Sequence, residues 1–241
     1  MTGEGRQEDA MGKLWRKMKN LIPEYGVMPL LIAVALNFSV YGGARVIAGD
    51  WIHHNIQGKL DGMIPFLPFT AAIYLGCYLF WIVNYILIAR RGKREVCQFF
   101  AADFISRLIC FACYLIYPTT NVRPVVEPEG FWNQVMILLY TIDAADNLFP
   151  SIHCLVSWFC FAGLRGERRI PRWYKAASCV MALLVCISTL TTKQHVIVDV
   201  VGGVALAELC LWIGKRPKVW KTYEKLLDEI DGKLLLEGGS A

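Results

Sequence analysis

The chain has 241 residues, of which 56% are hydrophobic and 19% are charged. Soluble globular domains carry about 25% charged residues, and the shortfall here falls in long uncharged runs such as residues 63–89. An apolar run of that length spans a lipid bilayer, so the sequence predicts an integral membrane protein. The net charge of +5 lies in clusters that flank apolar segments, a pattern that sets membrane orientation and excludes nucleic acid as an expected partner.

Apolar segments alternate with short charged segments along the chain. We expect six membrane-spanning helices and, within a long connection, an interfacial or re-entrant helix at residues 131–142. The fourth span is short and should begin near Pro150, because proline favours the first turn of a helix. The six spans are expected at residues 27–47, 64–89, 96–117, 152–164, 176–192 and 195–214.

Amphipathic segments are expected before and after the spans. Residues 11–21 have Leu14 and Trp15 on one face and basic residues elsewhere, which is typical of a helix on the inner membrane surface; a solvated basic tail is the alternative. Residues 220–230 predict a second amphipathic helix. The expected divisions are an N-terminal cytoplasmic segment (1–26), a membrane domain (27–214) and a C-terminal cytoplasmic tail (215–241).

Lysine and arginine cluster in four places: near the N-terminus, at residues 90–94, at residues 165–175 and at residues 215–221. Six crossings put these four segments on one side of the membrane, and cytoplasmic loops are enriched in basic residues. The sequence therefore predicts an all-α, six-helix transmembrane bundle in the cell membrane with both termini in the cytoplasm.

Several polar residues inside or beside the spans have ordinary structural explanations. Asp103 and Arg107 are four residues apart on one span and should form a structural ion pair. His53 and His54 belong to a polar loop, and adjacent histidines without further ligands are weak signs of a metal. The nine cysteines fall mostly in apolar spans, where cysteine behaves as a small hydrophobic residue.

Three short motifs fall on the outer side of the membrane in this topology: Arg-Pro after the third span, Pro-Ser-x-His at the start of the fourth, and Lys-x-His-x-x-x-Asp at the start of the sixth. No such motif falls on the inner side. We therefore expect their side chains to meet at one membrane face. The motifs contribute Arg123, Ser151, His153, Lys193, His195 and Asp199.

These residue types suit phosphoryl transfer without a metal or another cofactor. Arg123, Lys193 and Ser151 offer a guanidinium fork, a point charge and a hydroxyl donor to phosphate oxygens. His195 is the candidate nucleophile, oriented by the acid four residues later, and His153 is the candidate general acid and base. Asp143 and Asp146 lie nearby in the chain, but they are too few for a convincing divalent-cation site.

With these motifs the chain resembles the type-2 phosphatidic acid phosphatase and haloperoxidase-like superfamily. That family's pattern consists of Lys-x6-Arg-Pro, Pro-Ser-Gly-His and Ser-Arg-x5-His-x3-Asp, and the resemblance covers about residues 60–214. It implies a six-helix bundle of that family's kind and a phosphohistidine intermediate at His195. The matching positions are Arg123, Pro124, Pro150, Ser151, His153, Ser188, His195 and Asp199.

Some positions depart from the family pattern. The usual lysine is Ile116, the usual arginine is Thr189, and Ile152 replaces the glycine. Lys193 is a candidate substitute for one missing cation. Phe149 before the Pro-Ser-x-His motif makes the chain look more like the inositol phosphorylceramide and sphingomyelin synthase branch, whose members pass a phospho-headgroup to an alcohol.

Three functions are compatible with these motifs. The first is a lipid-phosphate phosphatase acting at the extracytoplasmic face. The second is a lipid phosphotransferase with the same catalytic residues and an alcohol acceptor, and the third is a non-enzymatic membrane protein. The expected partners are a lipid phosphate or phospholipid substrate and the membrane itself, while the sequence leaves the oligomeric state open.

Overall fold

The structure, a computed structural model, describes residues 21–238, with side chains described up to residue 231. Residues 11–20 of the expected N-terminal amphipathic helix lie outside the described residues. The described chain is helical apart from two short strands and the loops, as an all-α prediction requires. Its elements are α2 (Glu24–Ala48), β1 (His54–Asn55), η1 (Leu60–Met63), η2 (Pro68–Thr70), α3 (Ala71–Ala89), α4 (Lys93–Ile116), β2 (Thr119–Thr120), α5 (Phe131–Ile142), α6 (Ile152–Ala162), α7 (Arg172–Thr191), α8 (Ile197–Gly214) and α9 (Pro217–Gly238).

Five of these helices are long and apolar enough to cross a membrane: α2, α3 with the preceding η2 turn, α4, α7 and α8. The chain is therefore a multi-pass membrane protein. The predicted fourth span corresponds to α6, which has only 11 residues and is about 16 Å long at 1.5 Å per residue. A hydrocarbon core of about 30 Å exceeds that length, so the sixth crossing remains a prediction.

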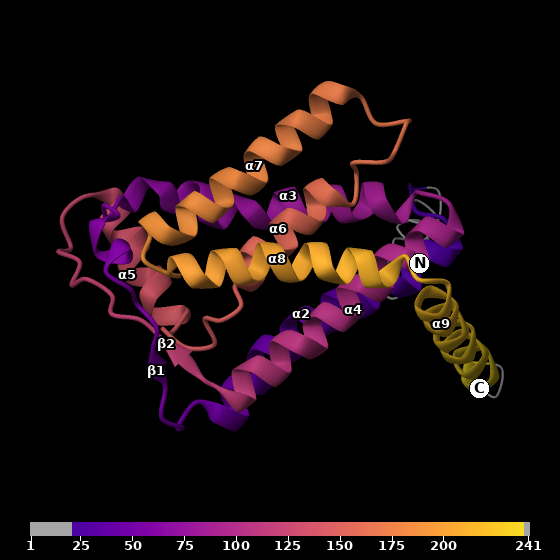
Figure 1. The fold of residues 1–241 in the computed structure, drawn as a ribbon, viewed down its shortest axis with the longest axis horizontal. Helices are drawn as coiled ribbons and strands as arrows, with labels where there is room; N and C mark the ends of the chain where they lie inside the picture. The colour runs from indigo at the N-terminus through magenta and orange to yellow at the C-terminus, as the bar shows by residue number, and fades with distance from the viewer. Residues whose placement is uncertain (1–20, 239–241) are drawn as a thin grey trace, which may run out of the picture.

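The helices form an elongated bundle organised around α4 and α6 (Figure 1). Helix α4 packs against α2, α8 and α9, while α6 packs against α3, α7 and α8. The strands, α5 and the η turns gather at one end of the bundle, and α9 extends from the other (Figure 1). The long connection between α4 and α6 thus covers one end of the bundle, and the start of α6 lies beneath it.

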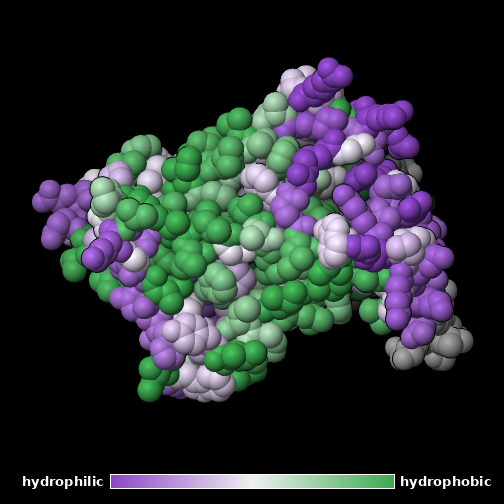
Figure 2. Space-filling view, viewed as in Figure 1, coloured by the Kyte–Doolittle hydropathy of each residue, from purple (hydrophilic) through white to green (hydrophobic). Residues whose placement is uncertain are grey.

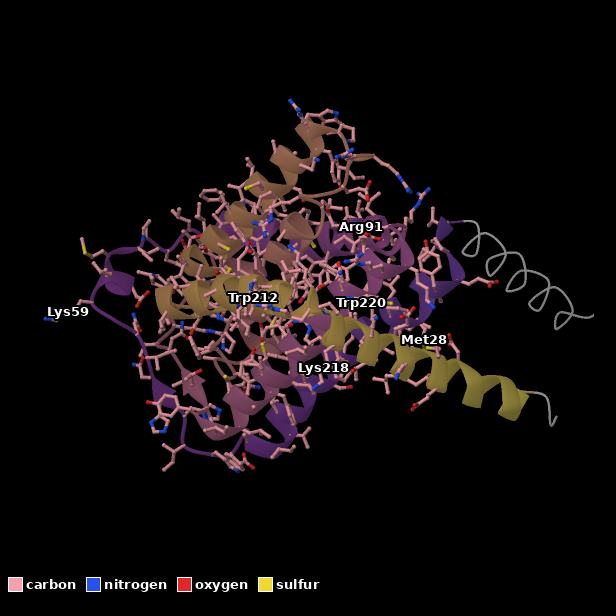
Figure 3. The ribbon with its side chains drawn as sticks, turned by 45° about the vertical axis from the view of Figure 1, so that its right-hand side comes forward. Met28, Lys59, Arg91, Trp212, Lys218 and Trp220 are labelled. Carbon is pink, nitrogen blue, oxygen red and sulfur yellow. The ribbon has the colours of Figure 1, made fainter. Side chains whose placement is uncertain are left out.

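The surface divides into an apolar belt between two polar ends (Figure 2). Lys59 projects at one end of the molecule, whereas Arg91 and Lys218 lie toward the other (Figure 3). Many large apolar side chains in the belt are exposed, including Phe38, Leu79 and Val201. Such a surface suits lipid, because a soluble protein rarely exposes an apolar patch of this extent.

Two adjacent glycines on α8 let the start of α6 lie directly against that helix. A Cβ on Gly202 would meet the ring of Phe149 at 2.5 Å, and a Cβ on Gly203 would meet the carbonyl oxygen of Ser151 at 2.6 Å. The backbone nitrogen of Ser151 also donates a hydrogen bond to the carbonyl of Asp199 at 3.1 Å. These contacts hold the Pro-Ser-x-His segment beside the first turn of α8.

The predicted Asp103–Arg107 pair is confirmed. Their atoms Oδ1 and Nη2 are 3.0 Å apart, and both side chains are 1% exposed. The hydroxyl of Tyr85 donates to the same carboxylate oxygen at 2.7 Å. Removing one partner of a buried pair leaves an unpaired charge, so we assign this pair a role in holding α3 and α4 together.

The predicted C-terminal amphipathic helix is present as α9. Tyr223 and Leu227 on this helix are buried and belong to the main core, while Lys93 forms an ion pair with Glu224 at 2.9 Å. The apolar face of α9 therefore packs on the bundle, chiefly on α4. Its location on the cytoplasmic membrane surface stays a prediction.

Candidate active site

A cavity of about 320 Å³ opens at the end of the bundle where the strands and α5 gather. Its wall includes His153 at the start of α6, His195 just before α8, and Arg123 from the long connection. These residues come from all three sequence motifs. The fold thus brings together side chains that are up to 72 residues apart in the chain.

His195 and Asp199 form a hydrogen-bonded pair. Nδ1 of the imidazole lies 3.2 Å from Oδ2 of the carboxylate, which also accepts the backbone N–H of Val196 at 3.0 Å. The sequence places the start of the sixth span at His195, but α8 begins only at Ile197, so His195 lies just before the helix. The carboxylate instead turns back over the helix N-terminus, and this capping geometry directs it to the imidazole.

The pair leaves the other imidazole nitrogen of His195 available. Nδ1 faces the carboxylate, so the neutral tautomer with its proton on Nδ1 presents a lone pair at Nε2. The ring of His153 lies 5.9 Å away, centroid to centroid. Two imidazoles at this separation in a cavity wall can flank one phosphorus atom, with one attacking it and the other moving a proton.

His153 is held by residues that the motifs did not indicate. The hydroxyl of Tyr74 lies 3.4 Å from Nδ1 of His153 and donates to Oδ2 of Asp143 at 3.0 Å. The Tyr74 ring also stacks on the imidazole with centroids 4.5 Å apart, and Tyr41 donates to the other oxygen of the same carboxylate. Both histidines therefore have a carboxylate behind them, one directly and one through a tyrosine.

Arg123 is anchored so that its guanidinium faces the cavity. It donates to the carbonyl oxygens of Asp143 and Ala144 and to the side-chain oxygen of Gln194, and it lies over the ring of Tyr140 at 4.6 Å. Its Nε has no partner among the described residues. An arginine fixed in this way offers a charged donor to an anion at little further entropic cost.

Lys193 does not line the cavity. Its backbone is in the left-handed region at φ 55°, which turns the side chain toward the η1 loop. There its ammonium donates to the carbonyl oxygens of Asp61 at 3.0 Å and Ile64 at 2.6 Å. The prediction that Lys193 contributes a phosphate-binding charge finds no support in this arrangement, and we assign the residue a structural role.

Ser151 is also outside the cavity wall. Its side chain is fully buried and caps α6 by accepting the backbone N–H of Cys154 at 3.3 Å. Serine is a preferred N-cap residue because its oxygen satisfies an otherwise unpaired helical donor. We therefore interpret Ser151 as the residue that starts the helix and sets the position of His153, rather than as a phosphate ligand.

The two departures that replace a basic residue of the family pattern, at Ile116 and Thr189, leave the cavity with few cations. Ile116 is 81% exposed at the end of α4, and Thr189 is fully buried, where its hydroxyl donates to the carbonyl of Cys186. Among the described residues, Arg123 is the only lysine or arginine in the cavity wall. Fixed positive charge on a bound phosphate thus depends on Arg123.

The nearby carboxylates are already engaged. Asp146 forms an ion pair with Arg45 at 3.4 Å, and Asp143 accepts hydrogen bonds from the two tyrosines. Among the side chains that the structure describes, up to residue 231, no three histidine, cysteine, aspartate or glutamate residues are grouped to hold a metal ion. The arrangement favours acid–base and nucleophilic chemistry carried by the two imidazoles.

The charge state of His195 is set by its surroundings. Burial alone would lower the pKa of His195, but the hydrogen bond and charge of Asp199 outweigh burial and raise the pKa above its usual 6.5. A raised pKa stabilises the imidazolium. Only a neutral imidazole can act as a nucleophile, so any nucleophilic reactivity of His195 should rise as the pH rises through this pKa.

Comparison with known proteins identifies the family of this chain. The family model described as the PAP2 superfamily matches residues 48–213, a range that includes every cavity-lining motif described above. The chain belongs to the PAP2 superfamily, the type-2 phosphatidic acid phosphatases, and its general activity is that of a phosphatase-type enzyme of lipid phosphates. No curated protein and no solved structure matches the chain.

Proposed function

We propose that this protein is a lipid-phosphate phosphatase that acts at the extracytoplasmic membrane face through a phosphohistidine intermediate, without a metal ion. The observation that carries the proposal is the pair of imidazoles in one cavity wall, with ring centroids 5.9 Å apart and Asp199 behind His195. A histidine with a purely structural role would be expected to use both ring nitrogens in hydrogen bonds, whereas Nε2 of His195 has no hydrogen-bond partner among the described residues and lies beside the cavity.

In the first step, Nε2 of His195 attacks phosphorus and the bond from phosphorus to the leaving alkoxide breaks. His153 gives its proton to that oxygen, so the lipid leaves as an alcohol. Arg123 balances the charge on the non-bridging oxygens. Asp199 stabilises the positive charge that develops on the attacking imidazole, since it holds Nδ1 of His195 at 3.2 Å.

In the second step, His153 accepts a proton from a water molecule, whose oxygen attacks the phosphorus of the phosphohistidine. The bond from phosphorus to Nε2 breaks, inorganic phosphate leaves, and His195 returns to its neutral form. Burial and the charge of His195 lower the pKa of His153 to about 4, and the charge of Asp143, which Tyr74 links to His153, opposes this shift and favours the proton-bearing form during these transfers. The residues therefore complete a catalytic cycle without any further reactant.

A second candidate is transfer of the phosphoryl-containing headgroup to an alcohol. The observation that favours it is the aromatic wall around His153: Tyr74, Trp81 and Tyr78 have ring centroids 4.5, 5.5 and 6.3 Å from its imidazole. An apolar surface beside the general base disfavours bulk water and suits a less polar acceptor. Product that forms only when an alcohol acceptor accompanies a phospholipid donor would favour transfer over hydrolysis.

The experiment that tests the proposal is phosphate release from a panel of lipid phosphates by the purified protein. We expect His195→Ala and His153→Ala each to lower kcat by at least about 100-fold, because positioned acid–base groups contribute about 10²–10⁴. Orthovanadate should inhibit the wild type by occupying the site of pentavalent phosphorus, whereas a chelator should leave the rate unchanged. Equal rates for wild type and both variants would overturn the assigned roles.

A further inference from the structure

A second hollow, which we call the lateral groove, adjoins the active-site cavity. It has a volume of about 290 Å³ and shares four wall residues with that cavity: Asn37, Phe38, Tyr78 and Trp81. Its remaining wall is almost entirely apolar. Shared walls make the groove a continuation of the catalytic cavity along the bundle.

The groove runs from the catalytic end toward the middle of the bundle. On α2 the cavity is lined by Tyr41 and the groove reaches Leu30, eleven residues earlier and therefore about 16 Å along the axis. On α3 the lining shifts in the same direction, from Leu75 in the cavity to Ile86 in the groove. Helix α2 packs mainly on α4, and the groove lies between α2 and α3, with Arg107 of α4 and Val156 of α6 completing its wall.

One charged side chain, Arg107, belongs to this apolar wall. The side chain is 1% exposed, and its Nη2 donates to Asp103 at 3.0 Å. Its Nε and Nη1 have no hydrogen-bond partner among the described residues. Buried donors without a partner are costly, so beyond its structural pairing with Asp103 the guanidinium has two donors for which a ligand in the groove can supply an acceptor.

We propose that the lateral groove binds an acyl chain of the lipid substrate and that Arg107 donates hydrogen bonds to the carbonyl oxygen of that chain's ester or amide linkage. This inference rests on the proposed function, because the phosphate of the same lipid occupies the cavity beside His195. An acyl chain is the occupant that the surroundings favour. The groove is apolar, it lies within the belt that faces lipid, and it joins the phosphate site directly.

The depth of Arg107 agrees with this occupant. Tyr114, which lines the cavity, lies seven residues further along α4, so Arg107 is about 10 Å nearer the middle of the bundle. In a phospholipid the carbonyl oxygen is several bonds from phosphorus, toward the chains. A lipid with its phosphate at the imidazoles therefore brings its carbonyl toward Arg107 and its chain into the deeper groove.

Binding of an acyl chain in the lateral groove is tested by a substitution at its lipid-exposed rim that fills the groove with a larger side chain. Val34 lines the groove and is 50% exposed, whereas Leu31 on the same helix is outside the wall and 52% exposed. We expect Val34→Trp to raise KM for dioleoyl phosphatidic acid about tenfold, as the loss of about two methylene contacts would. The rate with chain-free para-nitrophenyl phosphate should not change, and Leu31→Trp is the matched control.

The carbonyl contact is tested by comparing ester-linked phosphatidic acid with its dialkyl ether analogue, which lacks the carbonyl oxygen. The wild type should prefer the ester in kcat/KM by about tenfold, the value of one hydrogen bond from a charged donor. Arg107→Lys keeps a cation beside Asp103 and removes the planar guanidinium, so the ratio of kcat/KM for the ester to kcat/KM for the ether should fall toward one. An unchanged preference in Arg107→Lys would overturn the assignment to Arg107.

A binding measurement separates this inference from the proposed function. The His195→Ala protein is irradiated with phosphatidic acid that carries a diazirine on its acyl chain, and labelled peptides are mapped by mass spectrometry. Labels on α2 and α3 at groove residues, lost in Val34→Trp, support the inference even if no phosphatase activity is found. Labels elsewhere, or labels unaffected by Val34→Trp, would overturn it while leaving the chemistry of the two histidines intact.

Discussion

Asp199 determines at which pH His195 is able to attack. Because the carboxylate raises the pKa of His195 above 6.5, the acid limb of the pH profile of kcat/KM should lie above that value. Asp199→Asn removes the charge, so burial should then dominate and lower the pKa of His195. We expect the acid limb of Asp199→Asn to move to lower pH and the maximal rate to fall at least about tenfold, since the imidazolium loses its stabilising charge.

The measurement is the pH dependence of phosphate release from a lipid phosphate between pH 4 and pH 9. If the acid limb of Asp199→Asn moved to higher pH instead, the carboxylate could not be the group that raises the pKa of His195. His153→Ala serves as the comparison, because it removes the acid–base group while leaving the hydrogen bond between His195 and Asp199 in place.

Tyr74 links Asp143 to His153, and its hydroxyl can be removed without removing its ring. Tyr74→Phe keeps the stacking contact on His153 and deletes hydrogen bonds of 3.0 and 3.4 Å. A hydrogen bond of this kind contributes about 1 kcal/mol, so kcat should fall roughly five-fold with little change in thermal midpoint. Tyr117→Phe, on an exposed tyrosine outside the cavity, is the control; equal loss in both variants would argue against a linking role.

For individual residues of the site, the sequence predicted which motifs meet in space, but it did not predict the residues that hold the motif side chains in position. His153, His195 and Arg123 lie in one cavity wall because their motifs have a fixed order relative to the spans. Tyr41 and Tyr74 belong to apolar helices, and nothing in the sequence around them indicates a role in the site. Only the packing of the helices brings their hydroxyls to Asp143. The spacing of residues in the motif could not show in which direction the Lys193 side chain points, because this direction depends on the left-handed backbone conformation of Lys193.

At the scale of elements, the turn between α7 and α8 is fixed to the η1 loop. Lys193 donates to two carbonyl oxygens there, and Oδ1 of Asp61 accepts the backbone N–H of Ile197, the first residue of α8, at 2.8 Å. The loop therefore caps the helix that carries Asp199 and stabilises the position of His195. A polar loop between the first two spans thus contributes to the geometry of the site.

Lys193→Met tests this structural role against phosphate binding. Loss of two charge-assisted hydrogen bonds should destabilise the fold by about 2 kcal/mol and lower the thermal midpoint in detergent by several degrees. KM for a lipid phosphate should change less than twofold. Lys59→Met, at an exposed lysine, is the control, and a large rise in KM at unchanged stability would restore Lys193 as a phosphate ligand.

Element types were predictable from apolar runs, and element ends were not. The expected spans and the observed helices α2, α4, α7 and α8 overlap closely, because hydropathy determines what a bilayer accepts. Helix α3 begins only at Ala71, since Pro65 and Pro68 disfavour an earlier regular helix. Helix α6 ends after 11 residues, close to the end of the short fourth span that the sequence predicts.

At the scale of the whole molecule, the distribution of charge predicts the orientation in the membrane. The described basic segments at residues 90–94 and 215–221 lie at the end of the bundle opposite the active-site cavity, as the positions of Arg91, Lys218 and Lys59 illustrate (Figure 3). The apolar belt between the ends (Figure 2) marks the region that contacts lipid. Since basic segments stay in the cytoplasm, the cavity with its two histidines should face outward.

Cysteine labelling at the two ends tests this orientation directly. Lys59 and Lys218 are exposed; Lys59 projects at one end of the molecule (Figure 3), and Lys218 is in the first turn of α9 at the other end (Figure 1), so Lys59→Cys and Lys218→Cys form a matched pair. A membrane-impermeant maleimide added to intact cells should label Lys59→Cys and should reach Lys218→Cys only after permeabilisation, with the wild type reporting the native cysteines. The reverse pattern would place the cavity on the cytoplasmic side, where hydrolysis of an outer-leaflet lipid phosphate is impossible, and the substrate would then have to come from the inner leaflet.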